Sequence, residues 1–70
     1  MRNLIMSEKT DLELLIDAAG VQNVIEAIGE ICCGKAEHVE TNYQDRELAK
    51  AWRKVFLRLG PASAAAGLIP

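Results

Sequence analysis

The longest helical pattern of the chain runs from residue 21 to residue 42 and reads VQNVIEAIGEICCGKAEHVETN. Its apolar residues recur three or four positions apart, as they do on one face of a helix with 3.6 residues per turn. That apolar face carries Val21, Val24, Ile28 and Ile31, flanked by Ile25, Cys32, Ala36 and Val39. A break at Cys33-Gly34 is the competing interpretation. The apolar phase resumes correctly after Gly34, so we predict one continuous helix.

The opposite side of this central helix is acidic. Its carboxylates fall within about 80° of one another on a helical wheel, at Glu26, Glu30, Glu37 and Glu40. Such a ridge is either ordinary solvated surface or a docking face for a basic partner, and the sequence leaves both open.

Two amphipathic patterns flank the central helix. The first is predicted to begin at Thr10, because Thr10-Asp11-Leu12-Glu13 matches a capping box, and to end at Gly20. Leu12, Leu15, Ile16 and Ala19 form its apolar face, and Leu14 points away from that face.

The third pattern extends from about Asp45 to Leu59, and Gly60-Pro61 is predicted to stop it. Its apolar stripe consists of Leu48, Trp52, Val55 and Leu59, widened by Ala49 and Phe56. We therefore expect one helical domain over residues 1–60, and a flexible or partner-docked tail over residues 61–70.

Composition supports an all-α fold of small size. The 70 residues allow one domain, and sustained alternation typical of strands is missing. Ten of the apolar residues are alanine, so a lone core is marginal for a chain of this length. No segment has the roughly 18 apolar residues of a membrane span, and the adjacent Cys32 and Cys33 cannot bridge the fold. We expect a cytoplasmic protein with reduced thiols and no membrane association.

Charge is distributed unevenly along the chain. Residues 1–40 carry three basic and eight acidic side chains, net −5, whereas residues 41–70 carry five basic and two acidic, net +3. The polarity suits antiparallel pairing of segments within or between copies. The overall charge of −2 argues weakly against nucleic-acid binding.

The residues with metal-binding or catalytic chemistry do not form a recognisable site. Cys32, Cys33 and His38 lie on one helix, where His38 diverges from the two thiols by about 120–140°, so one straight helix cannot bring them to one ion. A site shared across a symmetric dimer is the alternative. No serine has a base nearby in sequence. We predict no catalytic residue, cofactor or metal.

Lys35 is the exception on the apolar face of the central helix, where it continues the series of Val21, Val24, Ile28 and Ile31. A charge at such a position often fixes register or oligomeric state. We expect Lys35 either to extend to water or to pair with Asp17, Asp45 or Glu47. A catalytic amine with a lowered pKa is the less favoured alternative.

The apolar faces of the three predicted helices are narrow, which predicts that two copies share them in a homodimer. The central helix would close this dimer through a seam of small residues, Gly29, Cys32 and Ala36. The expected interface comprises Val21, Val24, Ile28, Ile31, Cys32 and Lys35.

The expected function is that of a small non-enzymatic protein-interaction module. It would be a regulator or inhibitor, like accessory proteins of bacteria or phages, that docks a larger protein. The alternative is a nucleic-acid-associated accessory protein that uses the basic third helix. Candidate partner-binding residues are Glu26, Glu30, Glu37, Glu40, Arg53, Leu57 and Arg58.

Overall fold

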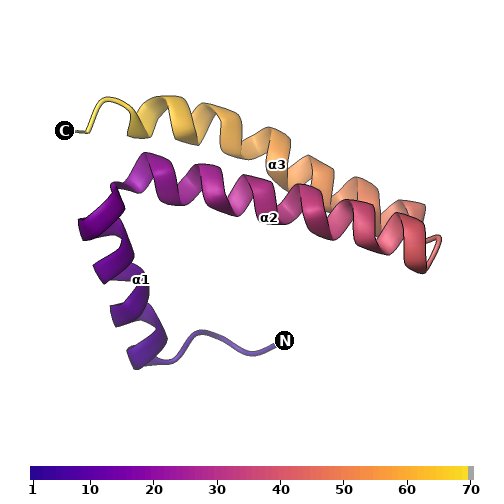
Figure 1. The fold of residues 1–70 in the computed structure, drawn as a ribbon, viewed down its shortest axis with the longest axis horizontal. Helices are drawn as coiled ribbons and strands as arrows, with labels where there is room; N and C mark the ends of the chain where they lie inside the picture. The colour runs from indigo at the N-terminus through magenta and orange to yellow at the C-terminus, as the bar shows by residue number, and fades with distance from the viewer. Residues whose placement is uncertain (70) are drawn as a thin grey trace.

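The computed structural model describes residues 1–69, which form three α-helices and no strand. They are α1 (Met6–Ala19), α2 (Val21–Asn42) and α3 (Arg46–Ala66). As Figure 1 shows, α2 and α3 lie side by side as an antiparallel hairpin, and α1 leaves the start of α2 at a steep angle. The predicted all-α fold is confirmed, and so is the continuous helix over residues 21–42.

Gly20 alone connects α1 to α2. Its φ of +89° lies in the left-handed region that favours glycine. Its N–H donates to the Ile16 carbonyl at 2.8 Å, and its carbonyl accepts from the Val24 N–H at 3.2 Å. The predicted end of the first helix is therefore confirmed, and the two helices meet with a single residue between them.

The start of α1 differs from the prediction, because the helix begins at Met6 and not at Thr10. The Glu8 carboxylate accepts from the Ile5 N–H at 3.0 Å, and Arg2 donates to both of its oxygens at 2.6 and 2.7 Å. Thr10 lies inside the helix, where its hydroxyl donates to the Met6 carbonyl at 3.0 Å. Glu8 thus takes the capping role expected of Glu13.

The end of α3 is a second correction, because the helix continues through Pro61 to Ala66. Proline inside a helix costs about 3 kcal/mol relative to alanine. The residues beyond it pack on α2: Gln22 Nε2 donates to the Ser63 carbonyl at 3.1 Å, and Ala66 is buried. Most of the predicted tail is therefore helix, and Pro70 lies outside the described residues. The start of α3 agrees with expectation, since the Asp45 side chain accepts from the Leu48 N–H at 3.0 Å.

The contact between α2 and α3 is a seam of residues spaced alternately three and four apart, as in helices that pack nearly parallel to each other. The seam consists of Gln22, Ile25, Gly29, Cys32, Ala36 and Val39 on α2, and of Ala49, Trp52, Phe56, Leu59, Ser63 and Ala66 on α3. The small residues Gly29, Cys32 and Ala36 were expected between two copies. They pack instead within one chain, and Cys32 is only 3% exposed.

The molecule is open in shape. It measures 40 × 28 × 15 Å and has a radius of gyration of 13.9 Å, whereas a compact domain of this length would have about 11 Å. The buried apolar residues are small, namely Cys32, Ala36, Ala49 and Ala66, and many large apolar side chains remain in water.

Candidate functional site: a groove on the charged face of the hairpin

The seam divides the hairpin surface into two faces. Because the spacing of the seam alternates between three and four, every seven residues of a helix contain two seam residues. In an antiparallel helix pair, the positions just after the second of these two residues lie on one face of the pair. The positions just before the first of them lie on the other face. Glu40 and Arg53 follow seam residues on α2 and α3, and they form an ion pair at 2.6 Å between the helices. We call this side the charged face.

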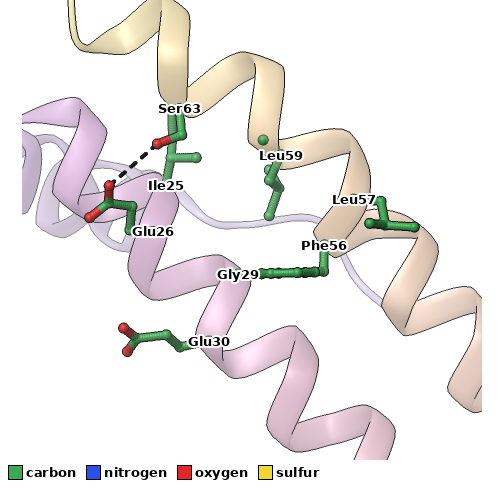
Figure 2. A pocket seen from close by; sticks show the side chains of 9 residues that line it. Ile25, Glu26, Gly29, Glu30, Phe56, Leu57, Leu59 and Ser63 are labelled. Atoms are coloured by element: carbon green, nitrogen blue, oxygen red, sulfur yellow. Dashed lines mark hydrogen bonds between the residues drawn. The ribbon is translucent and has the colours of Figure 1, made fainter.

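The charged face contains a groove of about 400 Å³ beside the first half of α2. Its floor is apolar, formed by Ile25 and Gly29 of α2 and by Phe56 and Leu59 of α3. Figure 2 shows the side chains around it. The wall on α2 is formed by Glu26 and Glu30, and the wall on α3 by Leu57, Gly60 and Ser63.

Gly29 and Gly60 explain why this part of the hairpin surface is hollow. A Cβ atom on Gly29 would lie 3.2 Å from Cδ2 of Phe56, so the glycine allows the ring to lie directly against α2 (Figure 2). Gly60 adds no side chain to the opposite wall. Pro61 follows it and has no N–H to donate to the Leu57 carbonyl four residues earlier. Helical backbone is consequently accessible at the exposed Gly60 on the α3 wall, whereas Gly29 is buried.

The charged side chains of the groove lie on its α2 wall only. Ser63 Oγ donates weakly to Glu26 at 3.5 Å, and Glu30 extends away from α3 (Figure 2). Within residues 1–69, neither carboxylate has a basic group within 4.0 Å. The α3 wall carries no charge, and Leu57 is 70% exposed. The groove thus combines an apolar floor with two carboxylates that are free to attract a base.

The structure brings together three of the candidate partner-binding residues, namely Glu26, Glu30 and Leu57. The others lie elsewhere. Glu37 is exposed further along α2. Arg58 lies beside Lys54 and Val55 around a different hollow of α3.

Glu40 and Arg53 lie beyond the groove and bind each other. The hydrogen bond from Arg53, aided by its charge, lowers the pKa of the Glu40 carboxyl, and the same contact raises the pKa of Arg53. Lys50 also has a carboxylate partner, Glu47, at 3.4 Å. The basic charge of α3 is therefore partly neutralised, which gives no specific support to the nucleic-acid alternative.

Lys35 is exposed, and no carboxylate of the described chain lies within 4.0 Å of it. Of the two expectations for Lys35, extension to water is therefore confirmed, and pairing with Asp17, Asp45 or Glu47 is wrong. Ile28 and Ile31 on the same side of α2 are exposed too, whereas Val21 and Val24 near α1 are half-buried. The expected homodimer stays a prediction.

The thiols and His38 do not converge in the structure. Cys32 lies in the seam and Cys33 is half-buried. The Nδ1 atom of His38 lies 3.1 Å from the Asn42 amide nitrogen, and its ring meets Tyr43 edge-on at 5.6 Å. Over residues 1–69, no three His, Cys, Asp or Glu side chains gather as a metal site would require. In the same range, no helix has the length and apolar character needed to cross a membrane.

The groove itself, with Phe56 at its floor and Ser63 at its far end, was not predicted from the sequence. Phe56 was assigned only as a widening of the apolar stripe, and Ser63 was placed in the tail. The signal for both was present: the alternating spacing of Phe56, Leu59, Ser63 and Ala66 continues in register through Pro61.

Comparisons with protein-family models, with curated proteins and with solved structures find no match to this chain.

Proposed function

We propose that this chain is a non-enzymatic docking module that binds a partner protein in the groove on its charged face. The observation that carries the proposal is the combination of an apolar floor at Gly29 and Phe56 with the free carboxylates of Glu26 and Glu30. The chemistry available there is apolar contact and charge attraction.

The groove fits one large apolar side chain with a lysine or arginine close to it. A volume of about 400 Å³ is at the small end of ligand sites, which are about 300–1,000 Å³. An amphipathic basic helix presents its anchors to a groove in this way. The apolar anchor would lie on Phe56, and the neighbouring base would meet Glu30.

A defined peptide tests the proposal without knowledge of the natural partner. The probe is a basic amphipathic helical peptide of about 18 residues with a central leucine, and its control has every base replaced by glutamate. We expect the basic peptide to shift the amide NMR signals of Gly29 and Gly60, and the acidic one to leave them unchanged. Equal binding of both peptides, or no shift at either glycine, would contradict the proposal.

Two charge reversals on the same helix test where the peptide binds. Glu30 and Glu37 are both exposed and lie seven residues apart on one side of α2, but only Glu30 lines the groove. We expect Glu30→Lys to weaken binding of the basic peptide at least tenfold, which corresponds to about 1.4 kcal/mol. Glu37→Lys is expected to weaken it no more than about threefold, because screening limits its reach. Similar losses would show attraction to the whole acidic ridge and not docking in the groove.

A further inference from the structure

The hairpin has a second, apolar face opposite the charged one. Ile28, Leu48 and Val55 each precede a seam residue by one position, which brings them to the same side of the antiparallel pair. The register set by Gly29 and Phe56 places Ile31 opposite Val55. Ile28 is 40% exposed, Ile31 59%, Leu48 45% and Val55 46%. We call this surface the open face.

The apolar side of α1 is uncovered as well. None of its residues is buried, and Leu15, on the face formed with Leu12 and Ile16, is 58% exposed. Figure 1 shows α1 projecting away from the hairpin and making contact only near the start of α2. An amphipathic helix and an apolar face that fits such a helix are therefore both present in one chain and are not in contact along their lengths.

The connection at Gly20 prevents α1 from lying along α2 of its own chain. Two antiparallel helices need a connection of about 2–5 residues. Here one residue separates them, and its N–H and carbonyl are bonded to Ile16 and Val24. Coverage of the open face by the chain's own α1 would require unwinding one of the two helix ends.

Charge favours α1 as the helix that covers the open face. α1 carries four acidic side chains and one basic, net −3. The cations at the borders of the open face are Lys35 on α2 and Lys54 and Arg58 on α3. None of these three has a carboxylate within 4.0 Å in the described chain. Length agrees too, because 14 residues of helix span about 21 Å.

We propose that two copies of this chain form a dimer by reciprocal exchange, in which α1 of each copy packs along the open face of the other. The exchange gives two identical contacts related by a two-fold axis, and short hinges such as Gly20 favour such exchange. It leaves the groove on the charged face free in both copies, so the proposal does not depend on the docking function.

The first test is the mass of the full chain by light scattering from about 5 to 500 µM. We expect twice the 7.7 kDa of one chain. Leu14 and Leu15 supply a matched pair of variants, since they are adjacent and similarly exposed, at 60% and 58%, but point to different sides of α1. We expect Leu15→Asp to give monomers and Leu14→Asp to leave the dimer intact. A native monomer throughout this range, or equal effects of the two variants, would overturn the proposal.

The second test is complementation, which separates exchange of α1 from a simple pairing of two open faces. Ile31→Asp damages the open face, and Leu15→Asp damages α1, so each variant alone has no intact contact. A mixed dimer has one intact contact, formed by α1 of the Ile31→Asp chain on the open face of the Leu15→Asp chain. We expect dimers to reappear on mixing, with circular dichroism showing that each variant remains helical. Folded variants that stay monomeric after mixing would rule out the exchange.

Discussion

Gly29 and Gly34 occupy the same helix but have different surroundings. A Cβ on Gly34 would meet nothing within 4 Å, whereas one on Gly29 would lie 3.2 Å from the Phe56 ring. Alanine in a helix interior is favoured over glycine by about 1 kcal/mol. We expect Gly34→Ala to raise the free energy of unfolding in urea by about that amount. Gly29→Ala should gain clearly less, because Phe56 must move. Equal gains would show that the ring is not held against Gly29.

The sequence identified candidate functional residues more readily than the residues that they contact in the fold. The carboxylates of Glu26 and Glu30 were identified from the helical period alone. The sequence could not show that Phe56 lies beneath them, because that contact joins residues far apart in the chain and depends on the register between two helices. Which of the two expectations held for Lys35 could not be read from the sequence for the same reason, since a wheel drawn for one helix shows an apolar face but not whether anything covers it.

At the scale of single helices, the start of α1 depends on one carboxylate. The Arg2 side chain, and secondly the Ile5 N–H, lower the pKa of Glu8 from 4.5 to about 2. Because the folded state favours the ionised form, its contribution is complete above pH 4.5 and is lost as the pH falls through 2. We expect the ¹³C signal of the Glu8 carboxyl to titrate with a midpoint near 2.

Glu8→Gln at neutral pH should reproduce the effect of acid. The Cα chemical shifts of Met6 and Ser7 should move toward coil values, because the Ile5 N–H and the Arg2 guanidinium lose their charged acceptor. Glu13→Gln, further along α1, is the matched control and should leave these shifts unchanged. A Glu8 midpoint near 4.5 would show that the contact with Arg2 does not persist in solution.

The boundaries of the helices show where local rules suffice. The 3.6-residue spacing of apolar residues predicted α2, and Gly20 predicted the boundary before it, because both effects act within a few residues. At Pro61 the local rule failed, since it treats proline as a stop and does not include the packing of Ser63 and Ala66 on α2. At the start of α1, two capping sequences competed, and Arg2 favours Glu8 over the one at Thr10.

For the whole molecule, the central question is what covers the apolar surface. The sequence pattern predicted that the small seam and the large aliphatic stripe of α2 belong to a single interface between copies. The structure separates them: α3 of the same chain covers the seam, and the aliphatic stripe with Ile28 and Ile31 stays open. A sequence pattern gives the two faces of α2, but it does not determine which of them pairs within the chain.

Lys35 is the one charge that continues the stripe of Ile28 and Ile31, and its replacement tests whether that face is shared. Complete burial of a leucine contributes about 1.5–3 kcal/mol, and the attraction between exposed charges that is lost is at most about 1 kcal/mol. In a dimer that buries the open faces of both copies, a net gain of about 1 kcal/mol per copy counts twice, so Lys35→Leu should lower the dissociation constant about thirtyfold. It should also raise the melting temperature more at high protein concentration than at low. Lys50→Leu adds the same side chain at an exposed position beyond the open face, and we expect neither change. If the melting temperature and the dissociation constant of Lys35→Leu matched those of Lys50→Leu, the open face would remain in contact with water and not with a second copy.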